Sequence, residues 1–212
     1  MITLRRRAAV PDRIATAPAA YVAVHDRADL ARHAALLDPL PRAGEVRVAT
    51  TPARRRGAWN LDIAARDRPG LLARTTGVLA AHGIGVLQAV VATWDDGAAL
   101  QSFVVDRHGA PGADEFARAL DRPYLPTSVA IASVTFDNDA SPAYTACEVV
   151  AADQPGLLHA IATVFADAGV DVHAASVDTV GGRARDRFDL SVAAGGKLSP
   201  AWHAAIARAL GF

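Results

Sequence analysis

The chain has 212 residues, of which 51% are apolar and 6% aromatic, so it is long enough for two small domains whose cores contain mainly small side chains. The 22 Lys and Arg residues balance the 22 Asp and Glu residues, which gives no support for a nucleic-acid or anionic-membrane partner. One cysteine excludes an internal disulfide, and the sequence shows neither a signal-peptide pattern nor an apolar run of about 18 residues, so we expect a cytoplasmic protein without a membrane partner.

Residues 1–43 are predicted to form an N-terminal arm and one helix. The first part, to about residue 20, is rich in Arg, Ala and Pro without periodicity, and we expect a mobile arm in which the arginines at 5–7 are solvated. A short extended piece is expected at 21–24. Asp26 is placed to cap a helix over 28–37.

Two further segments each show the order strand, strand, helix, strand, strand, helix. Alternating apolar residues indicate the strands, and apolar residues three and four apart indicate the helices. In the first unit, residues 44–123, strands are predicted over 45–50, 59–65, 84–94 and 98–106, with helices that begin near 69 and 113. In the second unit, residues 124–212, strands are predicted over 128–136, 144–152, 170–180 and 184–193, with helices that begin near 155 and 199.

An internal repeat relates the two units. The sequence Asp67-Arg68-Pro69-Gly70-Leu71-Leu72 returns 86 residues later as Asp153-Gln154-Pro155-Gly156-Leu157-Leu158. Twelve positions between residues 67 and 93 are identical to their partners at this offset. Only two copies are present, so the chain is predicted to contain one small domain twice rather than a solenoid.

The fold class predicted from this order is α+β, with two ferredoxin-like units. Each unit is expected to have a four-stranded antiparallel sheet with two helices on one face. A ferredoxin-like chain runs βαββαβ, but here no strand follows the last helix, and the strand that opens each unit takes that edge position. The units are therefore predicted to be circularly permuted (ββαββα). The second sheet face is expected to be covered in the first unit and more polar in the second.

The repeated loop is the main candidate for a binding site. Its glycine allows close approach to the backbone, and the N-terminus of the following helix attracts a carboxylate. Asp67 could bind an α-ammonium group or could instead cap the helix. The alternative is that Asp67 and Asp153 are only helix caps and the glycines only turn residues, and local chemistry alone leaves both interpretations open.

No constellation of catalytic residues is recognisable, so we expect neither an enzyme nor a cofactor. The histidines and the single cysteine lack metal-ligand spacing, and no phosphate-binding loop or nucleophile motif occurs. Cys147 is expected to be a small core residue. Asp171 and His173, beside the second loop, could face a ligand or form an exposed polar edge.

The motif Asp-x-Pro-Gly-Leu-Leu, followed by a helix that ends at Gly83 or Gly169 and then by a strand, resembles the ACT domain, a regulatory module that commonly binds amino acids. The segments 66–72, 102–106 and 185–188 are similar to the C-terminal tandem ACT region of the bacterial PII uridylyltransferase/uridylyl-removing family. The catalytic domains of that family lie outside the resemblance. It therefore implies the sensing half of a nitrogen-control system, with glutamine or a related amino acid as ligand.

This resemblance implies a site where the loop of one unit meets a strand of a neighbouring unit. The loops differ, because Gln154 replaces Arg68, and Asp171 and His173 replace Gly85 and Leu87. The alternative is an oligomerisation or docking module, a homodimer or a partner of another enzyme, without a small-molecule ligand. The candidate ligand-binding residues are Asp67, Arg68, Pro69, Gly70, Leu71, Leu72, Ile84, Gly85, Val86, Leu87, Asp153, Gln154, Pro155, Gly156, Leu157, Leu158, Val170, Asp171, Val172 and His173.

Overall fold

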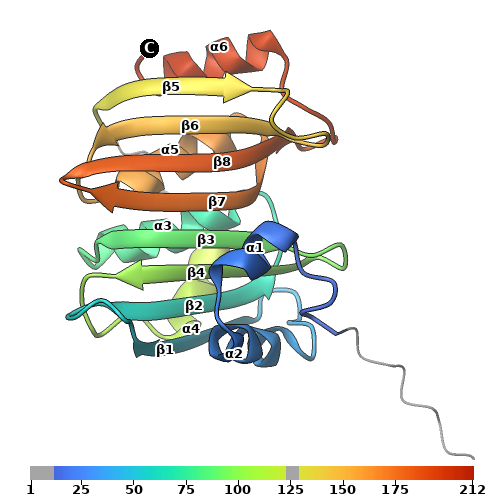
Figure 1. The fold of residues 1–212 in the computed structure, drawn as a ribbon, viewed down its shortest axis with the longest axis vertical. Coiled ribbons are helices and arrows are strands. Elements are labelled where there is room, and N and C mark those ends of the chain that lie inside the picture. The colour runs from blue at the N-terminus through green and yellow to red at the C-terminus, as the bar shows by residue number, and fades with distance from the viewer. Residues whose placement is uncertain (1–11, 123–128) are drawn as a thin grey trace, which may run out of the picture.

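The computed structural model describes residues 12–122 and 129–212 and has the predicted α+β architecture (Figure 1). The strands of the described part are β1 (Val46–Pro52), β2 (Trp59–Arg66), β3 (Val86–Thr93), β4 (Ala98–Val105), β5 (Ile131–Asp137), β6 (Thr145–Ala152), β7 (Val170–Val180) and β8 (Arg183–Val192). Its helices are α1 (Ala19–Val24), α2 (Arg27–Leu37), α3 (Leu71–Ala81), α4 (Ala113–Leu120), α5 (Leu157–Asp167) and α6 (Pro200–Ala209). The arginines at 5–7, the predicted boundary at 123/124 and the predicted strand start at 128 lie outside the described residues.

The strands form one continuous antiparallel sheet in the order β1-β2-β4-β3-β7-β8-β6-β5. The opening strand of each unit lies at an outer edge, β1 beside β2 and β5 beside β6, as the circular permutation predicts. The two four-stranded halves join through β3 and β7, which the sequence did not reveal. Val90 pairs with Ser176, its own equivalent in the repeat, so a pseudo-twofold axis passes between these two strands.

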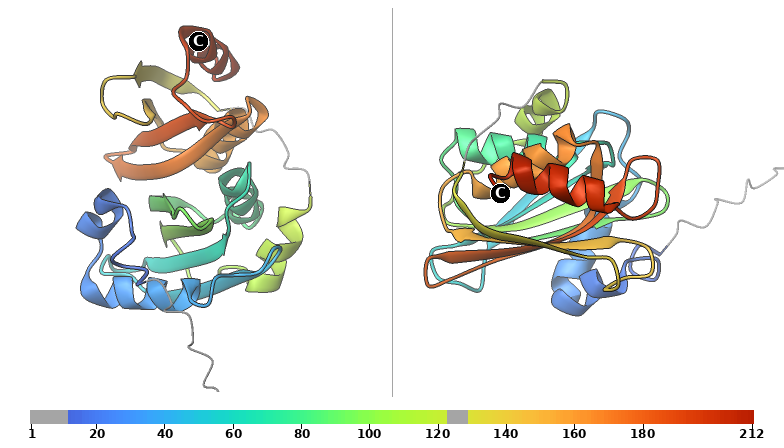
Figure 2. Two further views of the ribbon diagram at one scale, coloured as in Figure 1. Left: turned by 90° about the vertical axis from the view of Figure 1, so that its right-hand side faces the viewer. Right: turned by 90° about the horizontal axis from the view of Figure 1, so that it is seen from above.

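Helices α3, α4, α5 and α6 cover one face of the sheet, as predicted (Figure 2). The main core lies between these helices and the sheet and includes four fully buried aromatic side chains, Phe103, Phe116, Phe165 and Phe188. Helices α3 and α5 pack against each other above the junction of β3 and β7. The two units therefore share both a sheet and a helical layer.

The opposite face of the first unit is covered by the N-terminal segment, as expected from its apolar strands (Figure 2). Tyr21 and Leu37 pack there against Trp94 and Leu100 in a second core cluster. The predicted helix is present as α2, and the Asp26 carboxylate accepts a hydrogen bond from the Asp29 backbone N–H at 2.8 Å.

The expected extended piece at 21–24 is wrong, because residues 19–24 form helix α1. The expectation of a mobile arm up to about residue 20 is also wrong for its described part. Arg13 is only 4% exposed, and its carbonyl accepts a hydrogen bond from the Trp94 indole at 3.0 Å. A helix of this length is too short to be stable alone, and burial of Tyr21 and Trp94 against the sheet stabilises it.

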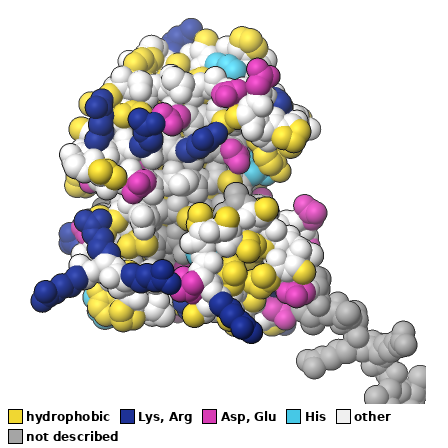
Figure 3. All heavy atoms as spheres, viewed as in Figure 1, with side chains coloured by type: hydrophobic (Ala, Val, Ile, Leu, Met, Phe, Trp, Pro, Cys, Tyr) yellow, Lys and Arg dark blue, Asp and Glu magenta, His cyan; other side chains and the backbone are white. Residues whose placement is uncertain are grey.

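The corresponding face of the second unit is open to solvent, as its polar pattern predicted. Figure 3 shows basic side chains spread over this face. The exposed residues Arg183, Arg185 and Arg187 lie on β8. In the first unit the strand register places the buried Ala98 and Leu100 at the positions of Arg183 and Arg185.

Candidate functional site

The two repeated loops have the same backbone geometry. Gly70 and Gly156 adopt left-handed conformations, with φ of 74° and 80°, and each occupies the N-cap position of its helix. The helix predicted to begin near residue 69 begins at Leu71, so Pro69 precedes it. A glycine can take this conformation without the steric cost that a Cβ atom would add.

No side chain caps α3 or α5. The expectation that Asp67 and Asp153 cap the helices, which is one half of the alternative, is therefore wrong. In each helix the first backbone N–H groups have no carbonyl partner within the helix and point out of its N-terminal end. The positive end of the helix dipole lies at the same place. This geometry suits the binding of a carboxylate.

The second loop faces a cavity of about 170 Å³ between the two units. The loop contributes one wall, and the beginning of β3 from the first unit contributes the facing wall. Volumes near 150 Å³ are sufficient for a ring the size of benzene. The predicted residues on this cavity are Ile84, Gly85, Val86, Leu87, Asp153, Gln154, Pro155, Gly156, Leu157 and Leu158.

The first loop faces the equivalent cavity, which measures only about 30 Å³. This volume is close to the share of one water molecule in the liquid. The predicted residues on this smaller cavity are Asp67, Arg68, Gly70, Leu71, Leu72, Val170, Asp171 and Val172. Pro69 and His173 do not line either cavity.

Three residues of the smaller cavity differ from their counterparts on the larger one. Phe165 lines the smaller cavity where the larger one has Leu79, and Asp171 stands where the larger one has Gly85. Gln101 lines the smaller cavity and is hydrogen-bonded to the Thr75 hydroxyl. Each of these three side chains projects from the wall of the cavity that has the smaller volume.

Asp186 lies on the wall of the larger cavity and was not predicted as a site residue. It is 1% exposed, and neither of its carboxylate oxygens has a hydrogen-bond partner among the described residues. Burial, together with the negative charge of Asp153, raises the pKa of Asp186 to about 7. The sequence pattern could have identified Asp186, because it lies on the same strand face as Phe188 and Leu190. A carboxylate on an inward, apolar face is costly unless it has a partner.

Two other residues of the larger cavity, Asp106 and His159, were not predicted as site residues. Asp106 accepts a hydrogen bond from the Gly85 backbone N–H at 3.0 Å, and a Cβ atom on Gly85 would lie 2.6 Å from the Asp106 carboxylate. His159 hydrogen-bonds to the Ala73 carbonyl at 2.9 Å across the contact between α3 and α5. Gly77 provides the space for this ring, since its Cβ would lie 2.9 Å from His159.

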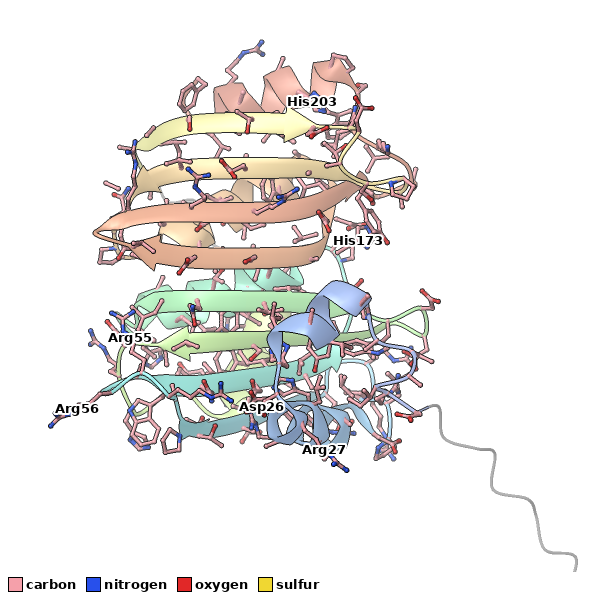
Figure 4. All side chains as sticks on the ribbon, viewed as in Figure 1. Asp26, Arg27, Arg55, Arg56, His173 and His203 are labelled. Atoms are coloured by element: carbon pink, nitrogen blue, oxygen red, sulfur yellow. The ribbon has the colours of Figure 1, made fainter. Side chains whose placement is uncertain are left out.

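Asp67 and Asp171 both line the smaller cavity. Partial exclusion of water by the surrounding protein raises the pKa of Asp67, and the negative charge of Asp171 raises it further. His173 instead hydrogen-bonds to the Ser191 hydroxyl at 2.8 Å and stacks on Tyr144, near the start of β7 (Figure 4). His173 therefore belongs to a polar edge, one of the two alternatives that the sequence left open.

Three further features of the described residues concern metal binding, thiol reactivity and membrane insertion. They contain no group of three or more His, Cys, Asp or Glu side chains that could hold a metal ion. Cys147 is completely buried, and burial raises the pKa of its thiol to about 12, in agreement with a core residue. Within the described part of the chain, no helix is long and apolar enough to cross a bilayer.

Comparison with protein families gives a match to the ACT domain over residues 60–122 and again over 145–199. The curated relatives include the bifunctional uridylyltransferase/uridylyl-removing enzyme of Caulobacter vibrioides (strain NA1000 / CB15N), which is 36% identical over 197 residues. The enzyme of the same name from Rhodospirillum rubrum is 31% identical over 196 residues.

These alignments cover 81% and 80% of this chain but only 20% and 21% of the two relatives. The chain thus spans about a fifth of the length of the relatives that it matches. Among solved structures, the aspartate kinase from Synechocystis aligns with a TM-score of 0.41 and 22% identity, over 65% of this chain and 25% of the kinase.

Proposed function

Since this chain belongs to the ACT-domain family, which it matches twice, we propose that it is a regulatory protein that senses an amino acid in the larger cavity. The observation that carries this proposal is the meeting of the Asp153–Leu158 loop with the beginning of β3 around a cavity of about 170 Å³. The α-carboxylate of the ligand would be held by backbone N–H groups at the N-terminus of α5. The smaller cavity is proposed to stay empty.

Glutamine, or a related amino acid read in nitrogen control, is the ligand that we propose. The support comes from relatives whose names describe uridylyltransferases and uridylyl-removing enzymes. Because the chain matches only about a fifth of those enzymes, we propose that it shares their sensing role and not their catalytic activity.

Thermal-shift measurements against the twenty amino acids test this proposal. A ligand that binds only the folded chain stabilises it by about 2.7 kcal/mol at a hundredfold excess over its dissociation constant. We expect glutamine or a close relative to raise the melting temperature, with one ligand bound per chain by calorimetry. No shift with any amino acid at millimolar concentration would contradict the proposal.

Two matched variants locate the binding event. Gly156→Ala and Gly70→Ala place a Cβ atom on equivalent left-handed residues, so both should lose stability by a similar amount of about 1–2 kcal/mol. Only Gly156→Ala is expected to weaken amino-acid binding, because Gly156 lines the larger cavity. Equal effects of the two variants on binding would contradict the assignment to this cavity.

The alternative function is a docking or oligomerisation module without a ligand. The open, arginine-bearing sheet face of the second unit favours it, because the same face of the first unit is covered. A stable oligomer or partner complex that forms without any response to amino acids would support this alternative.

A further inference from the structure

Asp186 and its equivalent in the first unit differ in a way that the shared fold does not require. Gln101 pairs with Val91 in the first unit, and Asp186 pairs with Val177, the equivalent of Val91, in the second. The two residues therefore occupy the same position on the walls of the two cavities. Because Gln101 is accommodated there, the sheet does not need a carboxylate at this position.

The environment of the two residues differs as well. The Thr75 hydroxyl hydrogen-bonds to Gln101, whereas the position equivalent to Thr75 in α5 is Ile161, which offers no polar atom. Asp186 is thus a buried carboxylate for which the described residues supply no donor. Such a group destabilises the folded chain unless something pairs with it. The nearby Asp153 carboxylate, which also lines the cavity, adds repulsion.

We infer that the larger cavity takes a ligand with an ammonium group and that Asp186 is the residue that binds this group. A cation that reached the Asp186 carboxylate would supply the missing partner and offset the repulsion from Asp153. The cavity then has two poles, the N-terminus of α5 for a carboxylate and Asp186 for an ammonium ion. This inference rests on the proposed function and specifies which feature of the amino acid is recognised.

Calorimetric titration of the full chain with two sets of probes tests the inference. The first set consists of the twenty amino acids and, for each that binds, the 2-hydroxy acid with the same side chain. In that analogue a neutral hydroxyl replaces the ammonium group while the carboxylate remains. The second set consists of simple primary amines without a carboxylate, such as ethylamine and putrescine.

Two variants isolate the role of Asp186. Asp186→Asn removes the charge and keeps the shape, and Asp189→Asn makes the same change on the opposite face of β8 as a matched control. We expect the 2-hydroxy acid to bind the unmutated chain roughly 10- to 100-fold more weakly than the amino acid does. The affinity of Asp186→Asn for the amino acid should fall by a similar factor. Asp189→Asn is expected to bind like the unmutated chain. The analogue comparison needs no mutation and tests recognition of the ammonium group even if Asp186→Asn fails to fold.

The outcomes separate this inference from the proposed function. Equal binding of an amino acid and its 2-hydroxy analogue, or equal binding by Asp186→Asn, would overturn the role of Asp186 and leave amino-acid sensing intact. Binding of amines without binding of any amino acid would support Asp186 and overturn the proposed function. The absence of binding by both sets would overturn both.

Discussion

Asp186 shows how one residue can link a binding site to the stability of the chain. Its pKa is raised from an ordinary value of 3.8 to about 7, by burial and by the charge of Asp153. A carboxyl group with a higher pKa in the folded state binds a proton more tightly there than in the unfolded chain. Asp186 therefore adds to the free energy of unfolding at a pH below 3.8, its pKa in the unfolded chain. This stabilisation is lost as the pH rises towards 7, its pKa in the folded chain.

Asp186→Asn is expected to remove this pH dependence. Each unit of pKa difference corresponds to about 1.4 kcal/mol. The free energy of unfolding of the variant, relative to that of the unmutated chain, should therefore rise by about 2–3 kcal/mol from pH 5 to pH 8. Urea denaturation at the two pH values measures the change in free energy of unfolding. Asp189→Asn serves as the control and should follow the unmutated chain. Parallel pH profiles for Asp186→Asn and the unmutated chain would show that Asp186 does not titrate as described.

At the scale of elements, a buried polar cluster attaches α1 and α2 to the sheet. The Asp62 carboxylate on β2 accepts hydrogen bonds from Arg32 at 2.7 Å, His33 at 3.0 Å and Ser102 at 2.7 Å. The Tyr21 hydroxyl on α1 extends this hydrogen-bond network, since it lies 2.6 Å from the His33 ring nitrogen Nδ1 and is hydrogen-bonded to it. Burial alone would raise the pKa of Asp62, but the hydrogen bonds from His33, Ser102 and Arg32 outweigh it, and the pKa lies below its ordinary value.

Asp62→Ala is expected to lower the free energy of unfolding by about 3–5 kcal/mol, because it leaves Arg32 without its buried counter-charge and His33 without its hydrogen-bond acceptor. Glu148 is the equivalent residue on the uncovered face of the second unit, where it pairs with the exposed Arg185. Glu148→Ala should therefore cost no more than about 1 kcal/mol. Urea denaturation measures both values, and limited proteolysis reports whether residues 12–40 detach first. Similar losses in the two variants would argue against a structural role for the cluster.

The sequence predicted the order of elements, the permuted edge strands and the helix starts near the repeated loops because each depends on local patterns. Alternation in β2 and β6, and the glycines that end α3 and α5, are visible without tertiary information. Helix α1 was missed because six residues carry too little periodic signal, and its stability comes from burial of Tyr21 against Trp94.

The site was predicted less completely than the fold. The loops and the facing strands were identified from the repeat and the family resemblance. The unequal volumes of the two cavities depend on how the side chains on their walls pack in three dimensions, which no local pattern reveals. The unpaired state of Asp186 likewise becomes visible only when the side chains around it are known.

At the scale of the whole molecule, the two units form one structural body. Strands β3 and β7 pair over residues 88–92 and 174–178, and α3 packs against α5 above them. Both cavities lie at this junction and take their walls from both units. A ligand in the larger cavity would therefore contact both units at once, and its binding would stabilise the junction and not a single unit.

This shared body predicts that the two units unfold together. In Trp202→Phe, the remaining indoles, Trp59 and Trp94, report only on the first unit, whereas far-UV circular dichroism follows all helices and strands. We expect the two signals to give the same urea midpoint, because separating the units would expose the buried apolar residues of α3 and α5 and break the β3–β7 ladder. Two separate midpoints would mean that each unit folds on its own. In that case a ligand between them would act by bringing together two independently stable domains.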